Sequence, residues 1–138
     1  MSQLLAKLQS QHGLPLLDAN NYEQFVYSHA DVVLFFSHDP TVFPESHDVA
    51  VILPELLKAF SGRLQAAVIS RVIERELQAR FHFTTWPALI FLRNGEYLGV
   101  ITGIKNWQEY LQEITQMLVA DVTEPPKFDL DKACGSQH

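Results

Sequence analysis

A single dipeptide, Asn94-Gly95, constrains the fold of this chain more than any other part of its sequence. It separates two apolar segments, ALIFLR at 88–93 and EYLGVITGI at 96–104. An Asn-Gly pair between two such segments is the strongest short hairpin signal that a sequence offers, because both central residues of the tight turn need a positive φ. The sequence therefore predicts two antiparallel strands joined by this turn.

Upstream of the hairpin, apolar runs alternate with segments whose apolar residues have helical spacing. The run DVVLFFS at 31–37 is continuous, as expected for a central strand that is buried on both faces. Pro54 lies inside one helical segment and removes one backbone hydrogen bond, so we expect that helix to bend. In chain order, the sequence predicts a helix at 3–11 that ends at Gly13, a strand at 14–18, a helix capped by Asn20 or Asn21, the strand at 31–37, a helix at 49–60, a strand at 63–72 and a helix at 73–81.

The chain should close with one more helix. Asn106 and Glu109 have the spacing of a capping box at its start. Prolines and polar residues then replace any periodicity, so we predict a folded domain over residues 1–122 and a disordered C-terminal tail over 123–138. The apolar stripe of the last helix consists of Trp107, Tyr110, Leu111, Ile114, Met117 and Leu118.

Length, charge and cysteine content limit the classes of function. A chain of 138 residues with 47% hydrophobic residues suits one domain, and its net charge of −6 argues against a nucleic-acid partner. Cys134 is the only cysteine, which excludes an intrachain disulfide and favours a cytoplasmic protein. No apolar run has the length of a signal peptide or a membrane span, so no membrane insertion is expected.

The element order β-α-β-α-β-α-β-β-α, with TTWPALIFLRNGEYLGVITGI before the last helix, resembles the thioredoxin fold over roughly residues 14–120. The resemblance implies an α/β, thioredoxin-like fold, with a central mixed sheet flanked by helices and an extra N-terminal helix. It places the cis proline of that fold on Pro87, its helix-kinking proline on Pro54 and its hairpin on Asn94-Gly95.

Thioredoxin activity depends on a Cys-x-x-Cys pair at the start of the second helix of that fold, because one thiolate attacks and the other resolves the mixed disulfide. The loop between Ser37 and Val49 contains no cysteine, and the pair would fall near Thr41 and Pro44. The acidic residue usual on the preceding strand is replaced by Phe35 or a neighbour. We therefore expect a redox-silent protein that is not an enzyme, with no catalytic residues and no cofactor.

The segments SHDPTVFPESHDVAVILPELL and WPALIFL resemble a narrower group, the HyaE/HupG-type hydrogenase expression proteins, which are thioredoxin-like but lack the CxxC motif. Members of this group are regarded as cytoplasmic chaperones for the small subunit of an uptake nickel-iron hydrogenase. The resemblance implies that the partner is the hydrogenase small subunit precursor, recognised through its twin-arginine signal peptide. It leaves open whether another hydrogenase accessory protein takes part.

The loop that lacks the cysteines is the centre of the candidate partner-binding site. Its carboxylates can pair bidentately with arginines, and two aromatic side chains offer apolar contacts. The backbone before the expected cis proline can pair with an extended peptide as an added strand. For Trp86, the rim of a groove and the core are equally compatible with the sequence. The candidate site residues are Asp39, Phe43, Glu45, Asp48, Glu55, Thr85, Trp86 and Pro87.

Two other functions are alternatives. A metal-delivery module would use His38 and His47 of the loop, but their spacing matches no standard site, so no metal is expected. A protein related to the thiol-disulfide oxidoreductases would use Cys134, which has no resolving partner.

Several polar residues have a simpler structural role. Ser46 or Asp48 is well suited to cap the helix after the loop, since both residue types favour that position. Taken one by one, Glu74, Glu76 and Glu96 are expected to belong to the solvated surface.

Overall fold

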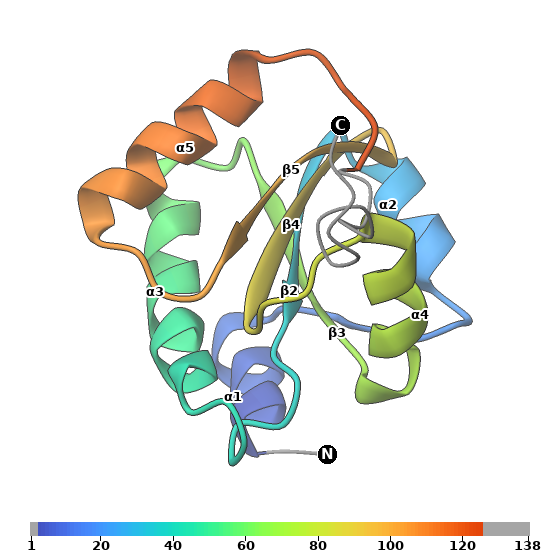
Figure 1. Ribbon diagram of the computed structural model, residues 1–138, viewed down its shortest axis with the longest axis vertical. Coiled ribbons are helices and arrows are strands. Elements are labelled where there is room, and N and C mark those ends of the chain that lie inside the picture. Colours follow the sequence, from blue (N-terminus) through green and yellow to red (C-terminus); the bar gives the residue numbers. More distant parts are fainter. Residues whose placement is uncertain (1–2, 126–138) are drawn as a thin grey trace, which may run out of the picture.

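Apolar strands and amphipathic helices alternate along the chain, and the computed structural model, which describes residues 3–125, packs them as one sheet with helices on both faces (Figure 1). In chain order the elements are α1 (Gln3–His12), β1 (Leu16–Leu17), α2 (Tyr22–Ser28), β2 (Asp31–Phe36), α3 (Glu45–Ala59), β3 (Gln65–Ile69), α4 (Arg71–Phe81), β4 (Ala88–Arg93), β5 (Glu96–Thr102) and α5 (Trp107–Val119).

The strand order of the sheet is β1-β3-β2-β4-β5. β1, β3 and β2 are parallel, since a helix connects each of these strands to the next along the chain. β4 runs antiparallel to both β2 and β5. In the turn between β4 and β5, Asn94 has a φ of 51° and Gly95 a φ of 84°, and Arg93 pairs with Glu96. The predicted two-residue hairpin is confirmed.

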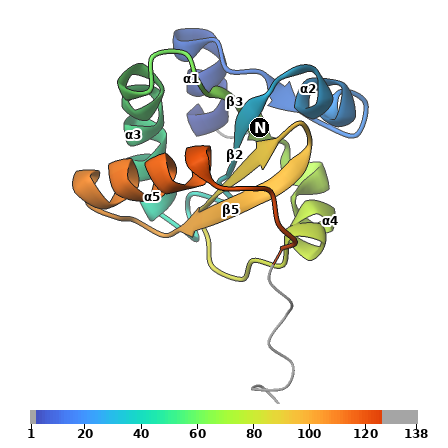
Figure 2. The ribbon, with the colours of Figure 1, turned by 90° about the horizontal axis from the view of Figure 1, so that it is seen from above.

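The central strand β2 contributes to both hydrophobic cores, because its side chains alternate across the sheet. Val33 and Phe35 face the core under α1, α3 and α5, whereas Val32, Leu34 and Phe36 face the core under α2 and α4. Figure 2 shows these two groups of helices on opposite sides of the sheet. All five side chains are at most 1% exposed, and burial of each contributes about 1.5–3 kcal/mol.

α3 begins at Glu45, earlier than the helical spacing predicted. Pro44 occupies the N-cap position, and no side chain makes a capping hydrogen bond. The prediction that Ser46 or Asp48 caps this helix is therefore wrong, since both residues lie inside its first turns. Ser46 is fully buried, and its hydroxyl instead donates to the carbonyl oxygen of Ser37 across 2.6 Å.

The starts of α4 and α2 also differ in detail from the prediction. The side chain of Ser70 accepts a hydrogen bond from the backbone N–H of Val72, so α4 begins at Arg71, two residues before the predicted helix at 73–81. Asn21 takes the N-cap position of α2, but its side chain makes no cap. Its amide donates to the carbonyl oxygen of Leu16 and so ties the helix to β1.

The capping box of α5 is confirmed, because Asn106 Oδ1 accepts from the N–H of Glu109 and Glu109 Oε1 accepts from the N–H of Asn106. Its apolar stripe is only partly buried. Tyr110 is fully buried, whereas Trp107 is 41% exposed. Trp107 is the first residue of the helix and precedes its first buried residue, Tyr110.

After α5 the chain stays attached to the sheet through Thr123, whose N–H donates to the carbonyl oxygen of Tyr97. Most of the tail predicted over 123–138, including Cys134, lies outside the described residues. No helix between residues 3 and 125 combines the length and the apolar character that a membrane span requires.

Candidate functional site

The loop that follows β2 and the segment before β4 meet at one end of the sheet. Phe36 and Ala88 are paired in the sheet, so the loop that begins at Ser37 leaves beside the turn that ends at Pro87. The peptide bond between Trp86 and Pro87 is cis, as the thioredoxin resemblance implied. A hydrogen bond from the N–H of Gly103 to the carbonyl oxygen of Pro87 brings the end of β5 to the same place.

Three rings, those of His38, Phe43 and Trp86, form an aromatic cluster at this end. The His38 ring lies 4.8 Å from both other rings, centroid to centroid, and meets each edge-on. Trp86 also packs against Phe83 and Phe36, which belong to the core under α4. Trp86 and Phe43 are half-buried. Trp86 therefore combines the two roles that the sequence left open, with one part in the core and another at the surface.

Asp39 builds the turn that presents Phe43. Its carboxylate accepts hydrogen bonds from the backbone N–H and the hydroxyl of Thr41, at 2.9 and 2.8 Å, and these bonds lower the pKa of Asp39. Its carbonyl oxygen accepts from the N–H groups of Val42 and Phe43. Because the Asp39 carboxylate is engaged within the loop, it is less available to a partner than the sequence suggested.

His38 is held in an uncommon backbone conformation, with a φ of 53°. Its N–H donates to Oε2 of Glu74 across 3.0 Å, and its Nδ1 accepts from the N–H of Asp39 across 2.7 Å. Since Nδ1 is an acceptor, the neutral ring carries its proton on Nε2. Burial, followed by the charge of Arg71, lowers the pKa of His38.

Glu74 is only 3% exposed, so the prediction that it belongs to the solvated surface is wrong. Burial raises the pKa of its carboxyl, while hydrogen bonds from the backbone of His38 and Ser37 and the charge of Arg71 act in the opposite direction. Nε of Arg71 lies 2.9 Å from Oε1 of Glu74 but is not aligned for a hydrogen bond, so this contact is an ion pair.

A signal for Glu74 was present in the sequence. Ile73, Leu77 and Phe81 mark the buried face of α4, and Glu74 lies beside that face because it precedes Leu77 by three positions. Helical spacing can place a residue near the buried face, but it cannot show which loop covers the residue.

The other candidate carboxylates spread along α3. Glu45 and Asp48 are exposed in its first turns. Asp48 lies near Tyr110 of α5, because its charge, after burial as the main cause, is among those that raise the pKa of Tyr110. Glu55 lies ten residues beyond Glu45, or about 15 Å along the helix axis, and pairs with Lys58 at 3.2 Å. Glu45 is therefore only two residues from Phe43, whereas Glu55 lies away from the aromatic cluster.

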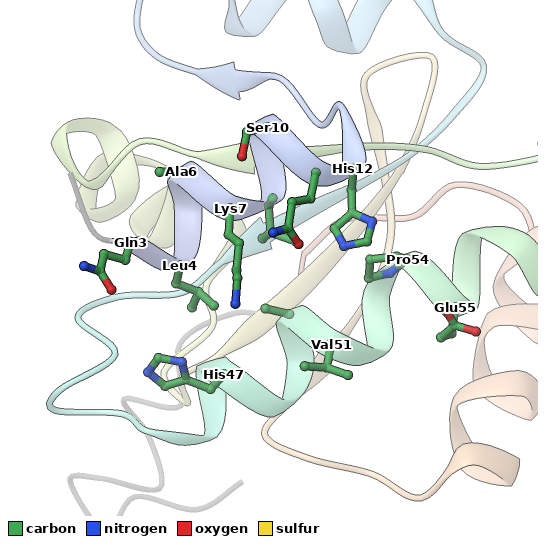
Figure 3. A pocket seen from close by; sticks show the side chains of 13 residues that line it. Gln3, Leu4, Ala6, Lys7, Ser10, His12, His47, Val51, Pro54 and Glu55 are labelled. Atoms are coloured by element: carbon green, nitrogen blue, oxygen red, sulfur yellow. The ribbon is translucent and has the colours of Figure 1, made fainter.

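Glu55 instead lines a groove of about 690 Å³ between α1 and α3 (Figure 3). Val51 and Pro54 are among the apolar residues of this groove, and His47 lies at one end of it. His47 thus lines the groove, whereas His38, the other histidine of the metal-delivery alternative, belongs to the aromatic cluster. Between residues 3 and 125, no group of three or more histidine, cysteine, aspartate or glutamate side chains is arranged to hold a metal ion.

Thr85 is exposed in the bend that precedes Trp86. The carbonyl oxygen of Pro87 is already bonded to Gly103, so a peptide strand would have to pair with the backbone before the proline. The site combines half-buried rings, exposed carboxylates and a short stretch of backbone, and its described residues include no thiol.

Comparison with known proteins identifies one family. The family described as "Hydrogenase-1 expression protein HyaE" matches residues 4–110. The chain is 43% identical to the hydrogenase expression/formation protein HoxO of Azotobacter vinelandii over 125 residues, which cover 91% of this chain and 84% of that protein. It is 40% identical to HupG, a protein with the same description from Rhizobium leguminosarum bv. viciae, over 125 residues that cover 88% and 84%.

Two solved structures are similar to the present one. A HupG hydrogenase expression/formation protein of Rhodopseudomonas palustris has a TM-score of 0.55 and 44% identity, with 75% of this chain and 94% of that chain covered. A Plasmodium falciparum thioredoxin has a TM-score of 0.61 and 15% identity, with 75% and 98% covered. The second similarity concerns the fold alone, and it confirms the thioredoxin-like fold predicted from the sequence.

Proposed function

Because the chain belongs to the HyaE family of hydrogenase expression proteins, we propose that it is a redox-inactive assembly factor for an uptake nickel-iron hydrogenase. In this role it is a cytoplasmic chaperone rather than an enzyme. It binds the precursor of the hydrogenase small subunit through the twin-arginine signal peptide, alone or together with another accessory protein.

The observation that carries this proposal is the aromatic cluster at the position where thioredoxins carry their thiols. The loop between Ser37 and Val49 has no cysteine, and half-buried rings of Phe43 and Trp86 lie there instead. Half-buried aromatic side chains are favourable contacts for a partner, because they bury a large area at a small cost in conformational entropy. Aromatic side chains that can bind a partner thus replace the thiols that would react with one.

The charges beside the cluster suit a basic peptide. Glu45 follows Phe43 by two residues and is exposed, and Asp48 lies one turn further along α3. Exposed ion pairs with arginines contribute less than about 1 kcal/mol each and weaken with salt. Contacts with Phe43 and Trp86 should therefore account for most of the affinity, whereas the carboxylates should favour arginine-containing segments over others.

A titration with a labelled signal peptide of the hydrogenase small subunit tests this proposal. Trp86→Ala and Phe43→Ala should each weaken binding about tenfold or more, as loss of an aromatic anchor does at other interfaces. The double variant Glu45→Gln/Asp48→Asn should weaken binding less and reduce its salt dependence. It leaves Asp39 in place, because Asp39 builds the loop.

Two controls make the result decisive. Trp107→Ala removes the other tryptophan, which is 41% exposed on α5, and Glu55→Gln removes a carboxylate of the α1–α3 groove. Both should bind as tightly as the wild type. If Trp86→Ala and Phe43→Ala stay folded and also bind as tightly, the peptide does not bind at the aromatic cluster.

A further inference from the structure

We propose that Glu74 is a positioning residue of the candidate site. It holds the loop that begins at Ser37 and contains His38, so that the aromatic cluster keeps its peptide-binding arrangement. The second step, in which this arrangement affects peptide binding, rests on the proposed function. The first step, control of the cluster by Glu74, concerns this chain alone and can be tested without any partner.

The geometry shows how a residue of α4 acts on a loop 36 positions earlier in the chain. Oε2 of Glu74 accepts the N–H of His38 at 3.0 Å, and the backbone of Ser37 is also close enough to lower the pKa of this carboxyl. Ser37 and His38 are the residues that directly follow β2. Charge-assisted hydrogen bonds of this kind are about twice as strong as neutral ones. Glu74 therefore contributes to the direction in which the loop leaves the sheet.

That direction sets the position of the His38 ring. A residue with a side chain rarely adopts a positive φ, and the backbone keeps it only where surrounding contacts enforce it. The φ of 53° at His38 is enforced by the bond to Glu74 on one side and by the bond from the Asp39 N–H to Nδ1 on the other. The ring is thereby held 4.8 Å from both Trp86 and Phe43.

Stability alone does not account for a carboxylate at this place. Glu74 is 3% exposed, and burial of a charge opposes folding unless partners compensate for the lost solvation. Burial is the larger effect here, since the pKa of Glu74 is raised despite its hydrogen bonds and Arg71. A neutral glutamine would avoid this cost and keep one oxygen acceptor for the loop.

The position of the loop should depend on pH, because Glu74 is titratable. Arg71 and the backbone of His38 contact Glu74, and the charges of Arg71, Asp39 and Arg75 act on the His38 side chain. Protonation of Glu74 removes the charge from its hydrogen bond with the N–H of His38 and from the ion pair with Arg71. Acidification should therefore loosen the loop with a midpoint above the ordinary pKa of glutamate, which is about 4.3.

A fluorescence titration tests the first step. The chain has two tryptophans, so Trp107→Phe leaves Trp86 as the only one. In this background the emission of Trp86 should change as the pH falls through the pKa of Glu74. With Glu74→Gln added, this transition should be absent, and the emission at neutral pH should equal that of the acidified parent. His38 and Asp39 remain in both proteins, so the difference between the two profiles isolates Glu74.

Peptide titration and urea unfolding then test the second step, with Glu76→Gln as the matched control, because Glu76 lies on the same helix but is exposed. At neutral pH, Glu74→Gln should weaken binding of the labelled signal peptide about tenfold, which corresponds to about 1.4 kcal/mol, yet unfold at an equal or higher urea concentration. A residue with a merely structural role would instead lower stability and affinity together. Glu76→Gln should change neither quantity.

The outcomes separate the two proposals. Identical fluorescence profiles with and without Glu74→Gln would overturn the control of the cluster by Glu74. A difference in the profiles together with unchanged peptide affinity would keep that control but remove its role in binding. If the wild type itself does not bind the peptide while the profiles differ, the proposed function fails and the control of the loop by Glu74 holds.

Discussion

The hydroxyl of Ser46 donates to the carbonyl oxygen of Ser37 across 2.6 Å, and both residues are fully buried. This bond links the first turn of α3 to the residue that follows β2, so it closes the loop of the candidate site at its base. The loop is therefore anchored twice, by Ser46 from α3 and by Glu74 from α4.

Removal of the Ser46 hydroxyl should destabilise the protein. Ser46→Ala leaves the carbonyl of Ser37 without this donor in a buried place, which costs about 1–3 kcal/mol. The urea midpoint should fall accordingly. Ser10→Ala is the matched control, since Ser10 is exposed on α1, and its midpoint should stay close to that of the wild type. Equal midpoints for both variants would show that the Ser37 carbonyl finds another partner.

Arg93 should be the residue that holds the C-terminal end of α5. Its Nε donates to Oδ1 of Asp31, and its two terminal nitrogens donate to the carbonyl oxygens of Leu118 and Ala120. The pair with Asp31 is partly buried, so Arg93→Ala should cost about 1.5–3 kcal/mol, the range for hydrogen bonds to charged groups. Arg93→Lys should recover only part of the loss, because an ammonium cannot reproduce the planar fork.

Thermal unfolding measures this effect, with Arg63→Ala as the control at an exposed arginine. Hydrogen exchange of the last turn of α5 should also quicken in Arg93→Ala. Protection that is unchanged there would contradict the anchoring role.

Two glycines with similar φ angles should differ in their tolerance of alanine. Gly62 has a φ of 79° and open space where a Cβ atom would lie, whereas at Gly95, with a φ of 84°, a Cβ atom would collide with the ring of Tyr27. Gly62→Ala should therefore report the backbone strain alone, about 1 kcal/mol. Gly95→Ala should cost clearly more, and urea unfolding of the two variants gives the difference directly. Equal losses would mean that Tyr27 moves aside freely.

The protein should not reduce disulfides. By the thioredoxin resemblance, the two thiols would fall near Thr41 and Pro44, and the only cysteine of the chain is Cys134. Neither threonine nor proline can form a mixed disulfide, so the purified protein should leave the rate of insulin reduction by dithiothreitol unchanged. Cys134→Ser should behave in the same way. A rate above that of dithiothreitol alone, if it persists in Cys134→Ser, would refute the proposed absence of redox chemistry.

Signals that act over a few residues predicted their structures well. The Asn94-Gly95 turn and the capping box of Asn106 and Glu109 were both confirmed, because each is completed by groups that lie close together in the sequence. The continuous apolar run of β2 also predicted burial on both faces, because a run without polar residues is incompatible with a solvated face.

The tertiary structure decided the roles of residues whose partners lie far away in the chain. Ser46 and Glu74 are residue types that suit a helix cap and a solvated surface, yet both are buried, because Ser37 and His38 need a donor and an acceptor there. Likewise, Phe43 and Trp86 come together only in the folded chain. Glu55 lies far from them, because it is ten residues beyond the start of α3. Local sequence patterns therefore account for most helices and strands and for the missing thiols, whereas packing brings the side chains of the site together, because burial and pairing depend on groups that lie far apart along the chain.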